Sequence, residues 1–144
     1  MYNQIMNKKI LIVDDSLSWL SFHKELITEL YGNLFEISLA NSANDAYDQI
    51  RRNINNPFCL IITDMQMELS FEGKHAGEWL IERIKELRQY YKTQIVIVSG
   101  VFNIEHIAKE YNVECLSKAL LVRNKLLMKF MFEKLMPFLT QIDN

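Results

Sequence analysis

Five short apolar runs alternate along the chain with longer amphipathic segments. The runs cover residues 9–13, 35–40, 59–63, 95–99 and 113–116. The first, third and fourth are continuous and rich in β-branched residues, which is typical of parallel strands covered by helices on both faces. We therefore expect these three runs at the centre of a parallel sheet.

The segments between the runs have the spacing of amphipathic helices. They lie at about 16–31, 42–53, 77–91, 103–111 and 119–142, with Ser16, Asn41 or Ser42, and Asn103 as candidate N-caps. Five strand and helix pairs in alternation predict an α/β fold. We expect a doubly wound, five-stranded parallel sheet between two helical layers.

Length and charge limit the kind of protein. The 144 residues favour one domain, which we place at 8–142, after a short N-terminal extension at 1–7 and without an effector domain. Lys and Arg number 16 against 18 Asp and Glu, so the chain lacks the basic excess that is usual in nucleic-acid binders. We expect no direct binding to nucleic acid.

The cysteines and apolar runs indicate a cellular location. Cys59 and Cys115 each lie in an apolar run and show no spacing for a metal site, so we expect free thiols in a reducing compartment. No run approaches the roughly 18 apolar residues of a spanning helix, and the apolar stretch near the N-terminus is too short for a signal peptide. These features predict a soluble cytoplasmic protein without membrane contact.

Polar residues end four of the apolar runs. Asp14 and Asp15 follow the first, Asp64 the third, Ser99 ends the fourth, and Lys118 comes just after the fifth. Each alone has a plain structural role as a cap, a turn residue or a solvated charge. Because ligands bind at the carboxyl ends of parallel strands, we expect the five to meet at one edge.

Such a cluster predicts a divalent cation. Three neighbouring carboxylates raise one another's pKa unless a cation is present, and a hard, oxygen-rich site suits Mg²⁺. A hydroxyl and an ammonium can bind the oxygens of a phosphoryl group, and an Asp can act as its nucleophilic acceptor. Asp64, on a central strand, is the best candidate for that acceptor.

The same positions, in their order and spacing, resemble the receiver domain of two-component response regulators. Four segments carry the resemblance: KKILIVDDS at 8–16, LIITDMQM at 60–67, IVIVSG at 95–100 and LSK at 116–118. It covers essentially the whole chain and implies a flavodoxin-like (βα)₅ receiver fold. It further implies a stand-alone signalling switch, in which Asp64 accepts a phosphoryl group from a histidine kinase or a histidine phosphotransfer protein.

The resemblance also implies the roles of the neighbouring residues. Asp15 and Asp64 would bind Mg²⁺ together with the main-chain carbonyl of Gln66, and Asp14 would act largely through water. Ser99 and Lys118 would bind phosphoryl oxygens, and Ser99 would shift when the group arrives. The chain would then be no enzyme beyond catalysing its own phosphorylation and dephosphorylation.

Three departures from the family pattern affect these expectations. The loop at 68–75 is longer than usual, and Glu68 and Ala119 stand where the family has proline. We therefore expect a trans bond between Lys118 and Ala119, because a cis bond before a non-proline residue is costly. Cys115 replaces the usual aromatic switch residue and cannot fill its volume, so we expect the signal to use another side chain, with Phe102 as one candidate.

The last predicted helix carries two apolar stripes. The stripe at 127, 131, 135, 138 and 142, with 121, 128, 132 and 139 beside it, is expected to face the core, and Pro137 is expected to kink or end the helix. Val122, Leu126 and Phe130 fall on roughly the opposite side. We predict that these three form the contact with a downstream protein target or a second copy.

Two other functions fit parts of the pattern. A small Mg²⁺-dependent phosphatase that works through an aspartyl phosphate would use Asp14, but no cap domain is available to exclude water. A receiver-like binding module that works without phosphorylation would not need the full set of polar residues.

Overall fold

The computed structural model describes residues 8–67 and 75–140, which form a five-stranded parallel sheet. The strands are β1 (Lys8–Val13), β2 (Phe35–Ala40), β3 (Leu60–Thr63), β4 (Gln94–Ser99) and β5 (Glu114–Ser117). Their order is β2-β1-β3-β4-β5, and every pair is parallel. The predicted fold class is confirmed: β1, β3 and β4 occupy the centre, as their apolar sequences indicate.

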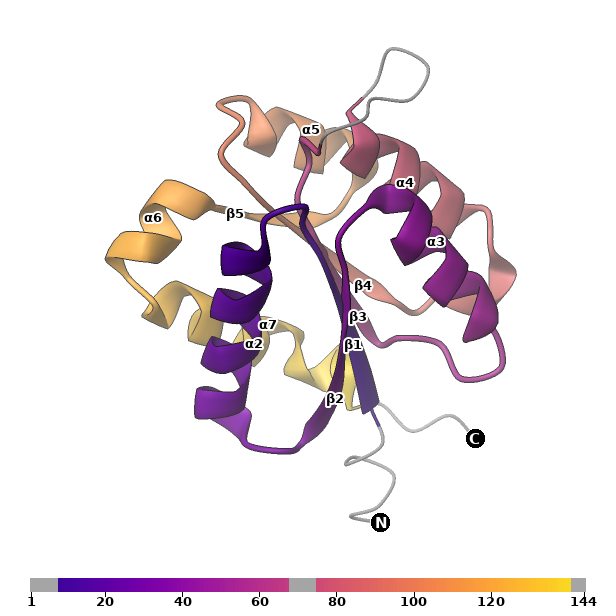
Figure 1. Ribbon diagram of the computed structural model, residues 1–144, viewed down its shortest axis with the longest axis horizontal. Coiled ribbons are helices and arrows are strands. Elements are labelled where there is room, and N and C mark those ends of the chain that lie inside the picture. The colour runs from indigo at the N-terminus through magenta and orange to yellow at the C-terminus, as the bar shows by residue number, and fades with distance from the viewer. Residues whose placement is uncertain (1–7, 68–74, 141–144) are drawn as a thin grey trace.

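Helices cover both faces of the sheet, which gives three layers (Figure 1). One face carries α3 (Ala43–Arg52), α4 (Ala76–Lys85) and α5 (Ile104–Tyr111), and the other carries α2 (Leu17–Tyr31), α6 (Lys118–Arg123) and α7 (Leu126–Leu139). The strand residues alternate between the two cores. In β1, Leu11 and Val13 pack under α3 and α4, whereas Ile10 and Ile12 pack under α2 and α7.

The first two predicted helix caps are confirmed, and the third is at the predicted N-cap position but makes no side-chain capping hydrogen bond. The Ser16 hydroxyl accepts a hydrogen bond from the Trp19 amide at 3.3 Å, and the Ser42 hydroxyl accepts one from the Asp45 amide at 3.0 Å. Asn103 precedes α5 but does not cap it with its side chain. Among the described residues no peptide bond is cis, so the bond between Lys118 and Ala119 is trans, as predicted.

Two helices differ in extent from the prediction. The segment at 77–91 is helical only to Lys85 and continues, after a short break, as the 3₁₀ turn η1 (Arg88–Tyr90). The segment at 119–142 is two helices, because Asn124 is extended and its side chain accepts a hydrogen bond from the Leu126 amide at 3.1 Å. This local side-chain bond competes with the helical backbone pattern and ends α6.

The buried face of α7 is also shifted from the predicted stripe. Met128, Phe132, Leu135 and Leu139 are buried, whereas Phe138, which we expected in the core, is exposed. Pro137 lies inside α7, whose last helical residue is Leu139, and residue 142 lies outside the described residues. The three predicted contact residues are exposed as expected: Val122, Leu126 and Phe130.

Within the described ranges, none of the helices combines the length and the apolar character that crossing a membrane requires.

Candidate functional site at the carboxyl edge of the sheet

Parallel pairing of β1 and β3 brings Asp14 and Asp64 side by side. Val13 is paired with Thr63, and each aspartate is the next residue in its chain segment. The Asp64 amide donates to the Val13 carbonyl at 2.9 Å, which continues the ladder one step beyond the strands. Asp15 completes a group in which one carboxylate oxygen from each residue lies within 4.8 Å of the others. The predicted acidic cluster is therefore present.

The three carboxylates differ in burial. Asp14 is 1% exposed and Asp64 is 6% exposed, whereas Asp15 is exposed to solvent. Burial raises the pKa of Asp14, and the nearby charge of Asp64 adds to this, while Lys118 and the Ser16 amide oppose it. The Ser16 amide donates to Asp14 Oδ1 at 2.9 Å, and the Met65 amide donates to Asp64 Oδ1 at 2.7 Å. The backbone thus fixes both buried carboxylates.

Lys118 is shared by the two buried carboxylates. Its Nζ lies 2.9 Å from Asp14 Oδ2 and 3.2 Å from Asp64 Oδ2. Burial alone lowers the pKa of Lys118, but its hydrogen bonds with Asp14 and Asp64 and their negative charges outweigh burial and raise it. The side chain starts at the first residue of α6, where the Ser117 hydroxyl accepts from the Leu120 amide at 3.4 Å.

Ser99 and Gln66 are the two remaining residues that we predicted for this edge of the sheet. Ser99 ends β4 at the same edge of the sheet and is 1% exposed, and its hydroxyl accepts from the Val101 amide at 3.3 Å. Gln66 follows Asp64 by two residues and its side chain is exposed. The longer loop that we predicted at 68–75 lies almost wholly outside the described residues.

Sequence reasoning missed Gly77 as part of this site. A Cβ atom at Gly77 would overlap the Asp64 carbonyl oxygen and lie 2.7 Å from the Met65 Cα. The Gly77 amide also donates to the Met65 carbonyl at 2.9 Å. Only glycine lets the start of α4 pack this closely against the backbone of Asp64 and Met65. A glycine inside a helical pattern was the available signal.

Sequence reasoning also missed Trp19, one turn into α2. Its ring centroid lies 4.9 Å from Lys118 Nζ, within the range of a cation–π contact. The Ser16 cap sets the start of α2 and so places Trp19 over the acidic edge. The two residues are 99 positions apart in the sequence, and no local pattern joins them.

The donor set fits a divalent magnesium ion. Three carboxylates and one ammonium leave a formal charge of −2, and every ligand atom offered by the carboxylates is a hard oxygen. Burial raises the pKa of Asp14 although the hydrogen bond with Lys118 lowers it, so a cation at this site would further offset the burial of negative charge. Asp14, Asp15 and Asp64 are the residues that would hold such an ion.

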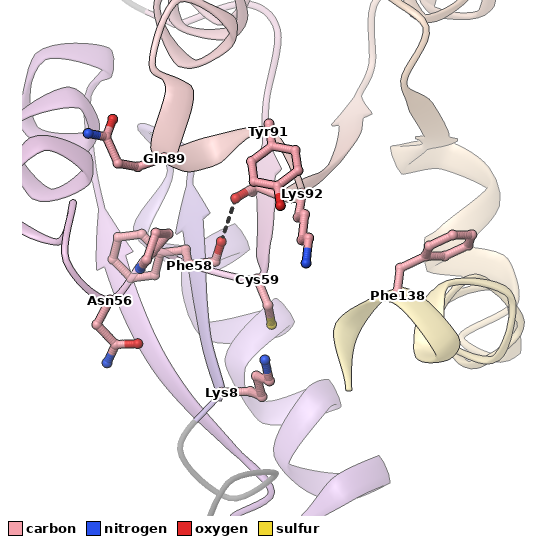
Figure 2. A pocket seen from close by; sticks show the side chains of 10 residues that line it. Lys8, Asn56, Phe58, Cys59, Gln89, Tyr91, Lys92 and Phe138 are labelled. Carbon is pink, nitrogen blue, oxygen red and sulfur yellow. Dashed lines mark hydrogen bonds between the residues drawn. The ribbon is translucent and has the colours of Figure 1, made fainter. Parts of the chain in front are cut away.

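A separate cavity of about 140 Å³ lies at the other end of the strands (Figure 2). Its lining includes Lys8 at the start of β1, Cys59 just before β3, Tyr91, and Phe138 from α7. The Thr93 hydroxyl donates to the Phe58 carbonyl at 2.8 Å beside it. Burial raises the pKa of Cys59 to about 11, so its thiol stays protonated near neutral pH. This cavity is remote from the acidic cluster.

Comparison with known proteins rests on structure. A scan of protein-family models found none that matches the chain, and a search of curated proteins found no match either. Solved structures match it over most of its length at low sequence identity. This likeness therefore establishes the fold.

The similar structures are response regulators. The signal receiver domain of a DNA-binding response regulator from Colwellia psychrerythraea 34H has a TM-score of 0.73 at 19% identity, with 90% of this chain and 98% of that chain covered. A CheY-like receiver domain protein from Methanospirillum hungatei JF-1 has a TM-score of 0.65 at 21% identity, covering 91% and 95%. The phosphorylated cyanobacterial phytochrome response regulator RcpA has a TM-score of 0.69 at 21% identity, covering 88% and 92%. The chain has the CheY-like receiver fold.

Proposed function

We propose that the protein is a phosphorylation-activated switch of a two-component or phosphorelay system, with Asp64 as the phosphoacceptor. The observation that carries the proposal is the buried pair of Asp14 and Asp64, which share Lys118 at 2.9 and 3.2 Å. Buried carboxylates that outnumber their cation are costly unless a ligand compensates them. The receiver fold supports a signalling role for that ligand site.

The proposed reaction transfers a phosphoryl group from a phosphohistidine of a kinase or phosphotransfer protein. A carboxylate oxygen of Asp64 forms a bond to phosphorus, the bond from phosphorus to the imidazole nitrogen breaks, and that nitrogen takes up a proton. Water later attacks the acyl phosphate and returns Asp64 and inorganic phosphate. The protein thus catalyses only its own modification and its reversal.

Each neighbouring group has a role in this proposal. Asp14, Asp15, Asp64 and the Gln66 carbonyl would hold Mg²⁺, which would supply positive charge against the incoming phosphoryl oxygens. Lys118 changes partner from a carboxylate to a phosphoryl oxygen. This exchange needs little movement of the Lys118 side chain, because its Nζ already lies 3.2 Å from Asp64 Oδ2.

Ser99 is the second phosphoryl-binding residue in the proposal. Its hydroxyl now accepts from the Val101 amide, and it would turn to donate to the modified Asp64. Cys115 on β5 is too small to act as an aromatic switch, so the movement of Ser99 is transmitted by another side chain. Phe102, which is 97% exposed, stays our candidate for that role.

The output is association with a protein target or a second copy through Val122, Leu126 and Phe130. Their side chains are exposed on α6 and α7 although each is apolar. We assign residues 8–142 to one receiver domain and place the protein in the cytoplasm, where its two free cysteines would stay reduced.

The test is intact-mass spectrometry after incubation with acetyl phosphate, with and without Mg²⁺. In Mg²⁺ we expect one phosphoryl group on the protein with its natural sequence, and none on Asp64→Ala. The matched control is Asp48→Asn, which removes an exposed carboxylate on α3 and should leave the modification intact. No modification, together with no binding of beryllofluoride, would favour a binding module that works without phosphorylation.

A further inference from the structure

Three ring side chains from one turn of α2 lie beside the acidic edge. They are Trp19, Phe22 and His23, with ring centroids 5.1 Å apart for Trp19 and Phe22 and 5.5 Å apart for Trp19 and His23. Residues spaced by three and four share one face of a helix. Lys118 Nζ lies 4.9 Å from the Trp19 ring centroid, and α2 and α6, which carry these residues, cover the same face of the sheet (Figure 1). The ammonium thus has carboxylates as partners and an aromatic ring in contact as well.

The rings carry no net charge near neutral pH. His23 is 1% exposed, and its Nδ1 finds no hydrogen-bond partner among the described residues. Burial, and then the positive charge of Lys118, lower the pKa of His23 to about 4. His23 therefore supports the Trp19 ring without adding a second positive charge next to Lys118.

We propose that Trp19 is a positioning residue that holds the Lys118 ammonium where it can reach a phosphoryl group on Asp64. This inference rests on the proposed function. The two carboxylates bind Lys118 in this structure. In the proposed function they would become partners of Mg²⁺ and the phosphoryl group. The Trp19 ring binds neither Mg²⁺ nor the phosphoryl group. It therefore continues to hold Lys118 after the carboxylates change partner.

A neutral ring suits this task better than a third carboxylate. A carboxylate beside Lys118 would add negative charge at the place where an anionic phosphoryl group must arrive. The quadrupole of an indole ring attracts a cation without carrying a net charge. The ring also covers one side of the ammonium and so limits the directions in which Lys118 can move.

The chain contains its own control for this contact. It has two tryptophans, and Trp79 on α4 packs in the core on the other face of the sheet. The Trp79 ring lies 5.6 Å from the Tyr47 ring and 5.8 Å from the Arg83 guanidinium. Changes in the electron density of Trp79 should leave Lys118 unaffected.

The test replaces Trp19 with tryptophans that carry one, two and three fluorine atoms, in a Trp79→Phe background. Fluorination weakens the cation–π attraction in steps and keeps the shape of the ring. The measured quantity is the dissociation constant for beryllofluoride in saturating Mg²⁺, obtained by titration calorimetry. We expect it to rise with each fluorine, by about three- to tenfold over the series. The same labelling at Trp79 in a Trp19→Phe background should give no trend.

The outcomes separate this inference from the proposed function. A flat series in a protein that binds beryllofluoride would show that Trp19 only fills space, and would overturn the positioning role alone. If neither the Trp79→Phe variant with its natural Trp19 nor the Trp19→Phe variant with its natural Trp79 binds beryllofluoride, the proposed function is overturned. The positioning role is then overturned with it. A graded series at Trp79 equal to that at Trp19 would likewise overturn the assignment to Trp19.

Discussion

Two lysines at opposite edges of the sheet each lie near an aromatic ring, but their surroundings shift their pKa values in opposite directions. Lys9, near the start of β1, lies 5.0 Å from the Phe58 ring centroid and donates a hydrogen bond to the Asn53 side chain. Burial lowers the pKa of Lys9, against the opposing charge of Glu36. Lys118, at the carboxyl edge, lies 4.9 Å from the Trp19 ring centroid, but the pKa is raised because two carboxylates outweigh burial.

The comparison shows how a structural and a functional buried charge differ. Lys9 donates to a neutral amide, lies near a ring and has the single opposing charge of Glu36, so its environment needs no further ion. Lys118 faces more negative charge than it can neutralise, and in our proposal a cation and an anionic phosphoryl group from outside would complete the carboxyl edge. The unbalanced edge is the one to which we assign the signalling chemistry.

Replacing each lysine by methionine sharpens the contrast most. Lys118→Met leaves two buried carboxylates without their cation and should lower the free energy of unfolding by about 2–3 kcal/mol. Lys9→Met loses one hydrogen bond and should cost about 1 kcal/mol. Urea denaturation checks both values. Mg²⁺ should restore most of the lost stability of Lys118→Met and none of that of Lys9→Met. Equal responses to Mg²⁺ would contradict the difference in charge balance between the two edges.

The buried His23 predicts a loss of stability in acid. Its pKa is about 4 in the folded protein against an ordinary value of 6.5, so the unfolded chain binds the proton more readily between these values. The free energy of unfolding should therefore fall as the pH drops from about 6.5 to about 4, by up to about 3 kcal/mol. His23→Leu should remove this part of the pH dependence.

The control for this measurement is His106→Gln, which changes an exposed histidine on α5. It should leave the pH dependence of unfolding as it is in the unmodified protein. An unchanged slope in His23→Leu would mean that His23 is not the group whose protonation destabilises the fold.

The buried Asp14 predicts a gain in stability on neutralisation. Because its pKa is raised in the folded protein, the ionised form costs stability at neutral pH, and that cost disappears as the pH falls through the folded pKa. Asp14→Asn should raise the free energy of unfolding at pH 7 by about 1 kcal/mol, and the stabilisation by Mg²⁺ should shrink. Asp48→Asn should change neither quantity. A loss of stability in Asp14→Asn would contradict the claim that the ionised Asp14 carboxylate destabilises the fold at neutral pH.

The smallest effect on stability is expected at Phe130. Phe130→Glu changes an exposed side chain and should alter the free energy of unfolding by less than about 0.5 kcal/mol. It should nevertheless abolish the association that follows phosphorylation, measured by gel filtration of the phosphorylated protein alone and with its target. Phe138→Glu is the matched control on the same helix, because Phe138 is similarly exposed but lies by the cavity at the amino edge. Intact association in Phe130→Glu would remove Phe130 from the interface.

The sheet and the acidic cluster could be predicted because their determinants are local. Continuous β-branched runs identify buried parallel strands, and the residue after each run must lie at the carboxyl edge. Asp14, Asp64 and Lys118 therefore meet where we expected them. The hydroxyls of Ser16 and Ser42 could be recognised as caps for the same reason.

The remaining features depend on competition or on distant contacts. The apolar periodicity runs unbroken through Asn124, whose side chain nevertheless ends the helix by binding the Leu126 amide. The spacing predicts that Tyr90 continues the helix, but Tyr90 belongs to the separate turn η1. Its hydroxyl donates a hydrogen bond to the Ile50 carbonyl at 2.7 Å. The contact of Trp19 with Lys118 and the close approach of Gly77 to Asp64 are set by tertiary packing. No pattern in a single sequence segment contains them.

The most direct test of the central proposal identifies the residue that carries the phosphoryl group. The protein is phosphorylated with acetyl phosphate in Mg²⁺ and reduced with borohydride, which converts an aspartyl phosphate to homoserine, and the peptides are then sequenced by mass spectrometry. We predict homoserine at position 64 and an unchanged aspartate at positions 14 and 15. Homoserine at position 14 would instead indicate the phosphatase-type use of the first strand and would contradict the assignment of Asp64 as the phosphoacceptor.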